Sequence, residues 1–118
     1  MTPAAHALLA RAHSLLESPE GAAVGNSARL AAVLTRQAVE ELIDARCADL
    51  CGVPEVNGSA RARRAVLMSL DDTAYSAVLI DAWHHLTACC HQHAYALSPT
   101  VIEVRSLRDA VAHCIGAT

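Results

Sequence analysis

The sequence predicts an all-α fold, an up-and-down bundle of four to five helices built as a single domain over residues 1–118. Apolar residues make up 53% of the chain and aromatic residues only 3%, so alanine, leucine and valine supply most of the apolar content. Alanine has the highest helix propensity because it loses no side-chain entropy on entering a helix. Apolar residues also recur at helical spacing between glycines and prolines, with little strand-like alternation.

Two helices are expected in the N-terminal half. The first covers about residues 4–17, and its apolar face consists of Ala5, Leu8, Leu9, Ala12 and Leu16. After the loop at 18–26, Ser27 can cap a second helix that runs to about Leu50. Its apolar positions at helical spacing are Ala31, Leu34, Ala38, Leu42 and Ala45.

The C-terminal half is expected to hold the long central helix of the bundle. A third helix begins near Ala60 and breaks in the stretch SLDD at 69–72, where Ser69 or Asp71 can start a new helix that runs to about Leu97. With a rise of 1.5 Å per residue, this helix would span about 39 Å. Pro99 stops it, and Thr100 with Glu103 has the spacing of a capping box for a last helix. The core stripe of that helix is Val101, Val104, Leu107, Val111 and Ile115.

The long helix is apolar on nearly all sides, which predicts a second contact surface. One face carries Tyr75, Leu79, Ala82, Leu86, Cys89 and His93, and the opposite face carries Ala77, Ile80, His84, Ala88, His91 and Tyr95. A helix that is apolar all round is buried all round, and in so small a bundle the simplest second partner is another copy of the chain. We therefore expect a homodimer, with interface or binding residues Ile80, Trp83, His84, His91 and Tyr95.

Charge and cysteine content narrow the classes of function. The net charge is −3, so nothing indicates a general nucleic-acid binder, and the cluster Arg61, Arg63 and Arg64 is interpreted as a solvated helix start. Five cysteines without a signal peptide or a membrane-spanning apolar run favour a cytoplasmic protein with reduced thiols and no membrane partner. No cofactor is expected, because the sequence has neither a glycine-rich phosphate loop nor a paired-carboxylate site.

The stretch AWHHLTACCHQHAYALSPT, residues 82–100, holds four of the seven histidines and two of the five cysteines. His85, Cys89 and His93 are spaced i, i+4, i+8 and could bind zinc along one flank of a helix. Structural zinc sites usually draw ligands from separate elements, and this chain has no CxxC motif. Buried cysteine usually behaves as a small apolar residue. Packing is therefore the favoured interpretation, and a metal site is the alternative.

Two stretches resemble the HEPN superfamily of small all-α bundles, which dimerise and are common in prokaryotic toxin–antitoxin and defence systems. The stretch RQAVEELIDA at 36–45 is similar to that superfamily's helix R-Q-A-x-E-x-A-L-x-A. Arg108, Asp109 and His113 match its R-polar-x-x-x-H pattern. In ribonucleases of this kind, which use no metal, the resemblance implies that Arg108 contacts the scissile phosphate and His113 transfers protons during 2′-hydroxyl attack.

Three hypotheses about function follow from these residues. The first is a non-catalytic dimeric binding module, since the superfamily has catalytically silent members that partner antitoxins or nucleotidyltransferases. The second is a metal-independent endoribonuclease acting on RNA, in which Arg108 and His113, about 140° apart on one helix, would meet only across a dimer seam. The third is a metal-binding helical protein using the 84–93 cluster. The string CHQHAYALSPT also resembles a C-H-x-H-A-Y-x-L-x-P-T signature of small actinobacterial proteins, which implies no activity.

Overall fold

A computed structural model describes residues 2–17, 27–53, 58–71, 73–91 and 99–116, and five helices lie within these ranges. They are α1 (Pro3–Glu17), α3 (Ser27–Cys51), α4 (Ala60–Leu70), α5 (Ala74–Cys90) and α6 (Val101–Cys114). The described ranges contain no strand. The predicted all-α bundle is therefore confirmed.

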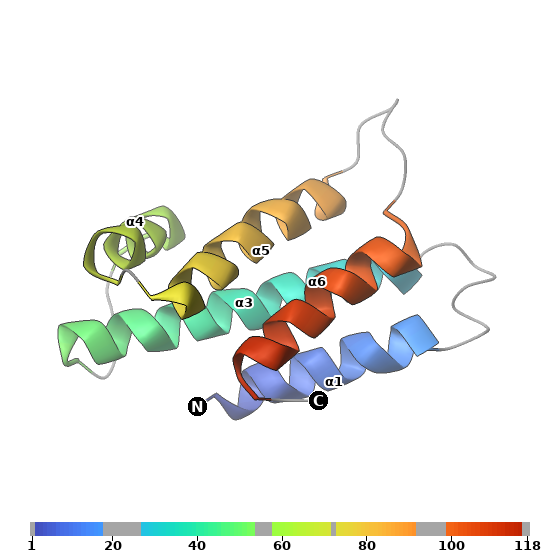
Figure 1. Cartoon of the computed structure of the whole chain (residues 1–118), viewed down its shortest axis with the longest axis horizontal. Coiled ribbons are helices and arrows are strands. Elements are labelled where there is room, and N and C mark those ends of the chain that lie inside the picture. The colour runs from blue at the N-terminus through green and yellow to red at the C-terminus, as the bar shows by residue number, and fades with distance from the viewer. Residues whose placement is uncertain (1, 18–26, 54–57, 72, 92–98, 117–118) are drawn as a thin grey trace.

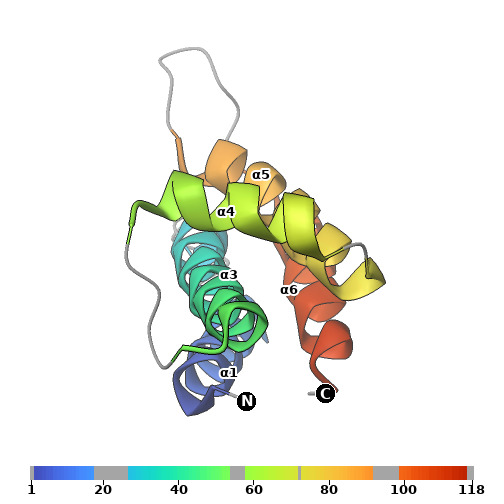
Figure 2. The ribbon, with the colours of Figure 1, turned by 90° about the vertical axis from the view of Figure 1, so that its left-hand side faces the viewer.

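Four of the helices form an up-and-down bundle, and the fifth lies across one end of it. The helices α1, α3, α5 and α6 run alternately in opposite directions along the long axis (Figure 1). Viewed from the end, α4 crosses the other helices instead of running beside them (Figure 2). The central helix is α3, because it contacts each of the other four. None of the helices in the described ranges is long and apolar enough to cross a membrane.

The helix α5 is shorter than the sequence predicts. It ends at Cys90, and His91 has an extended backbone whose N–H donates to the carbonyl of Thr87 at 3.1 Å. The predicted continuation to about Leu97 is therefore wrong, and the longest described helix is α3. Threonine and cysteine have lower helix propensity than alanine or leucine, and they supply three of the four residues in the last turn of α5, at 87–90. Residues 92–98 lie outside the described ranges.

The predicted helix boundaries agree with the structure at some positions and differ at others. Thr100 caps α6 as predicted, because its hydroxyl accepts from the backbone N–H of Glu103 at 3.0 Å. The predicted break in the stretch 69–72 is also present, since α4 ends at Leu70. The N-cap position of the next helix is Thr73, however, and not Ser69 or Asp71, and the side chain of Thr73 makes no capping hydrogen bond. Ser27, which the sequence predicts as a cap, is instead the first residue of α3 and is buried.

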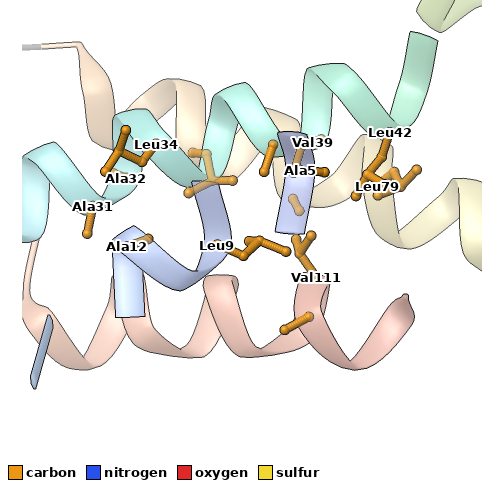
Figure 3. Packing of buried hydrophobic residues seen from close by; sticks show 14 of the residues in the cluster. Ala5, Leu9, Ala12, Ala31, Ala32, Leu34, Val39, Leu42, Leu79 and Val111 are labelled. Carbon is orange, nitrogen blue, oxygen red and sulfur yellow. The ribbon is translucent and has the colours of Figure 1, made fainter. Parts of the chain in front are cut away.

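The core combines small and branched apolar residues. Five alanines of α1 and α3 have no exposed surface, which permits close approach of these two helices; they are Ala5, Ala12, Ala31, Ala32 and Ala38. Larger side chains, among them Leu9 of α1 and Val111 of α6, fill the space between the helices (Figure 3). Around this core the bundle leaves one face of α5 without an intramolecular cover, and that face positions the candidate site.

Candidate interaction surface

The two faces of α5 have different environments in the structure. The face predicted to point inward is buried, and its members within the described ranges include Leu79, Ala82, Leu86 and Cys89. On the opposite face Ile80 is half-buried, and Ala77, His84, Ala88 and His91 are exposed. His93 and Tyr95, which the sequence also assigns to these faces, lie outside the described residues. The part of α5 that the structure describes therefore presents an apolar face to its surroundings.

This face of α5 and the neighbouring helix α4 form the two walls of an open groove of about 430 Å³. We call it the α4–α5 groove; its lining residues are Leu67, Met68, Asp71, Thr73, Ser76, Ala77, Ile80, Asp81 and His84. On the α4 side the side chains of Met68 and Leu70 are 71% and 62% exposed. Large apolar side chains and an apolar hollow thus lie together on one surface, as they do at protein–protein interfaces.

A polar network fixes the end of the groove at the turn between α4 and α5. The buried carboxylate of Asp71 accepts from Nε of Arg46 at 2.7 Å, from Oγ of Ser76 at 2.6 Å and from the backbone N–H of Thr73 at 3.0 Å. These hydrogen bonds, the one from Arg46 above all, hold the pKa of Asp71 well below its usual range. Because Arg46 belongs to α3, this ionised carboxylate attaches the turn to the central helix.

Trp83, predicted as an interface residue, is half-buried and contacts other helices of its own chain. Its Nε1 donates to the carboxylate of Glu40 on α3 at 3.2 Å. The guanidinium groups of Arg64 and Arg36 lie 3.6 and 5.4 Å from its ring centroids. Trp83 therefore joins α5 to α3 and α4 through a hydrogen bond and cation–π contacts.

The residues assigned to phosphate and proton chemistry occupy different environments on α6. Arg108 is only 6% exposed; its Nε donates to the carbonyl of Leu9 on α1 at 3.2 Å, and its Nη1 pairs with Asp109 at 2.9 Å. Asp109 and His113 are exposed. The guanidinium of Arg108 thus joins α6 to α1. A signal for this burial is present in the sequence, since Arg108 falls between Val104 and Val111 at helical spacing on the core stripe.

The residues of the alternative metal site also differ in burial. Cys89 is buried and its thiol donates to Glu103 at 3.5 Å, whereas the side chain of His85 is 62% exposed and lies 3.8 Å from Asp81. Burial raises the pKa of Cys89 to about 11, so its thiol stays protonated at neutral pH and is a poor metal ligand or nucleophile. Within the described ranges, no group of three or more His, Cys, Asp or Glu residues could hold a metal ion. His93 lies outside those ranges.

Comparison with models of protein families, with curated proteins and with solved structures gives no match. The surface is therefore interpreted from its own residues. The apolar pattern of α5 predicted residues on the α5 side of the groove, but no residue on the α4 side, where Met68 is exposed, was predicted. A signal for the α4 side is present in the sequence as the apolar run at 65–68, directly after the basic cluster of Arg61, Arg63 and Arg64.

Proposed function

We propose that the protein is a non-catalytic helical interaction module of HEPN-like architecture that forms a homodimer through the α4–α5 groove. One observation carries this proposal: Met68 of α4 is 71% exposed and lines the same hollow as Ala77 and Ile80 of α5. Exposed apolar clusters of this kind mark association surfaces in small helical proteins.

A second copy of the chain is the occupant that the groove fits best. A two-fold dimer requires a self-complementary surface, in which each feature on one copy meets its counterpart on the other. The groove supplies a protruding side chain, Met68, and a hollow beside it on the same face, so two copies can each place Met68 into the other's groove. Burying one methionine side chain contributes about 1.5–3 kcal/mol, and a two-fold dimer makes the contact twice.

The rim of the groove also suits an antiparallel pair of α5 helices. Asp81 and His85 are largely exposed and lie within one turn of His84. If two α5 helices pair antiparallel about a two-fold axis close to the groove, the carboxylate of Asp81 on one copy approaches the imidazoles of His84 and His85 on the other. Polar pairs at a rim set orientation and specificity more than affinity, so the apolar centre supplies most of the binding energy.

Light scattering coupled to size-exclusion chromatography tests the dimer. We expect the wild-type protein at micromolar concentration to have twice the 12.4 kDa mass of one chain. Met68→Glu places a charge on an exposed position, so it should give a monomer with an unchanged helical circular-dichroism spectrum. Ser106→Glu, on the exposed side of α6, is the matched control and should remain dimeric. A monomeric wild type, or a dimeric Met68→Glu variant, would refute the proposal.

The non-catalytic part of the proposal has its own test. The arrangement around Arg108 supports a structural role, because its guanidinium contacts a backbone carbonyl of α1 and a neighbouring carboxylate. Wild type and His113→Ala should therefore give identical, background-level products when incubated with total RNA in EDTA. RNA cleavage by the wild type that disappears in His113→Ala would show a ribonuclease instead.

A further inference from the structure

The helix α4 is anchored through far fewer apolar contacts than the helices of the bundle. Of its eleven residues only Leu67 is buried, whereas α5 buries residues along its whole length. It also crosses the end of the bundle and does not run beside a neighbour (Figure 2). Elements with little buried apolar surface open at a lower free-energy cost than the rest of a protein.

Polar contacts supply most of the remaining attachment of α4. Nη1 of Arg63 lies 3.0 Å from a carboxylate oxygen of Asp44, and the guanidinium of Arg64 stacks 3.6 Å from the ring centroid of Trp83. The thiol of Cys47 donates to the carbonyl of Arg63 at 3.1 Å. Ion pairs with partly exposed partners contribute little stability, so these contacts set the position of α4 more than they hold it in place.

The surface beneath α4 has the character of a site for a basic amphipathic helix. We call it the α3–α5 slot; it consists of Glu40, Ile43, Asp44 and Cys47 of α3 and Trp83 of α5. Two carboxylates, an aromatic ring and a buried thiol thus lie under a helix that presents arginines and one buried leucine. A helix seated with basic and apolar side chains on a complementary groove is a recurring mode of peptide recognition.

The backbone on either side of α4 permits movement of this helix. Gly52 and Gly58, at the two ends of the connection from α3, have φ values of 68° and 120°, in the region that favours glycine. At the other end, the carboxylate of Asp71 remains bonded to Arg46 and to the start of α5. The helix can therefore swing away on the Asp71 turn while the turn itself stays attached to α3.

We propose that α4 is a flap that detaches while α1, α3, α5 and α6 stay folded, and that the α3–α5 slot then binds a basic amphipathic helix of a partner protein. While α4 is attached, as in the structure described, it occupies the slot itself. The partner helix should carry the side chains that α4 places on the slot. These are two adjacent arginines, equivalent to Arg63 and Arg64, which contact Asp44 and Trp83, and a leucine one turn later, equivalent to Leu67.

The slot lies on the bundle side of α4 and the proposed dimer uses its outer side, so detachment of α4 also removes one wall of the α4–α5 groove. Labelling of the Met68→Glu variant, which is expected to be monomeric, therefore measures the flap separately from the dimer.

Cysteine labelling measures the opening directly. Cys47 lies beneath α4 and Cys89 lies in the core between α5 and α6, and both are buried. Iodoacetamide modification of each cysteine is followed by peptide mass spectrometry, and each rate is divided by its own rate in denaturant to remove differences in thiol pKa. We expect Cys47 to be modified at least about tenfold faster than Cys89 on this scale, because a local opening costs less free energy than global unfolding. Equal normalised rates would show that Cys47 is reached only by global unfolding and would overturn the flap.

A pair of variants on α4 sharpens the measurement. Leu67→Ala should accelerate modification of Cys47 by about 30-fold while changing that of Cys89 by less than about twofold, since it removes the one buried side chain of the flap. Ser69→Ala, at an exposed position of the same helix, is the matched control and should change neither rate. Parallel acceleration of Cys47 and Cys89 in Leu67→Ala would contradict independent opening.

A synthetic peptide of residues 59–71 tests the slot. Added to the Leu67→Ala protein, it should slow modification of Cys47 and change the fluorescence of Trp83, the only tryptophan of the chain. The control peptide carries glutamate in place of Arg61, Arg63 and Arg64. Protection by the arginine peptide alone supports the slot, whereas protection by neither peptide, or equally by both, would refute it.

Discussion

Truncation of Arg108 distinguishes a structural arginine from a catalytic one. In Arg108→Ala, the charged hydrogen bond to the carbonyl of Leu9 is lost, together with the packing of a side chain that is almost fully buried. The same substitution at a surface arginine that contacts only substrate would remove neither an intramolecular hydrogen bond nor buried packing. We therefore expect Arg108→Ala to lower the stability of the bundle.

The structure allows a rough magnitude for this loss. A hydrogen bond from a charged donor contributes about 1.5–3 kcal/mol. Each buried methylene of the stem adds about 0.8 kcal/mol. The pair with Asp109 adds little, because that carboxylate is exposed. The cost of burying the guanidinium is relieved in the variant, which brings the net destabilisation to about 2–3 kcal/mol. For a chain of this size, that corresponds to a fall in Tm of roughly 6–12 °C.

Thermal and urea unfolding followed by circular dichroism measure this change. Arg61→Ala, at an exposed position of α4, is the control and should unfold within about 0.5 kcal/mol of the wild type. Arg108→Ala with a Tm within 1–2 °C of the wild type (roughly the effect of 0.5 kcal/mol) would refute the structural role.

Three further changes test other parts of the fold. Asp71→Asn should lower the urea midpoint at pH 7, and its difference from wild type should shrink as the pH falls below about 4, because a depressed carboxyl pKa stabilises the fold only while the group is ionised. Thr100→Ala should cost about 1 kcal/mol by removing the cap of α6, as measured by urea unfolding. Leu79→Ala should cost about 2–5 kcal/mol in the same assay because Leu79 is fully buried. Leu70→Ala, at an exposed position, should cost less than about 0.5 kcal/mol, and equal losses in these two leucine variants would contradict the observed packing.

Local signals in the sequence predicted much of the fold. Helical spacing predicted the core positions of α5, and the hydroxyl of Thr100 three residues before Glu103 predicted the start of α6. These signals depend on interactions within a few residues, so they can be recognised without tertiary structure. The end of α5 at Cys90 has only a weak local signal, the low helix propensity of its last turn, because the next proline is Pro99 and no glycine intervenes.

Only the α5 side of the α4–α5 groove could be predicted, because local signals in the sequence do not reveal contacts between residues far apart in the chain. The exposed face of α5 could be identified from its apolar composition, but the position of α4 depends on long-range contacts such as that between Arg63 and Asp44. The burial of Arg108 depends on a backbone carbonyl of α1, nearly a hundred residues away in sequence. The resemblance to the HEPN pattern implied that Arg108 contacts a phosphate, and only the packing of α6 against α1 shows the carbonyl of Leu9 as its partner.

Cysteine cross-linking tests most directly whether the α4–α5 groove is the dimer surface. Ala77→Cys places a thiol on the exposed face of α5 within the groove, and Ala110→Cys places one on the exposed side of α6, both in a Cys51→Ser background. The account predicts that mild oxidation converts Ala77→Cys into a covalent dimer on non-reducing gels and leaves Ala110→Cys monomeric, at concentrations where the unmodified protein is dimeric. Cross-linking of both variants to the same extent, or of Ala110→Cys alone, would contradict it.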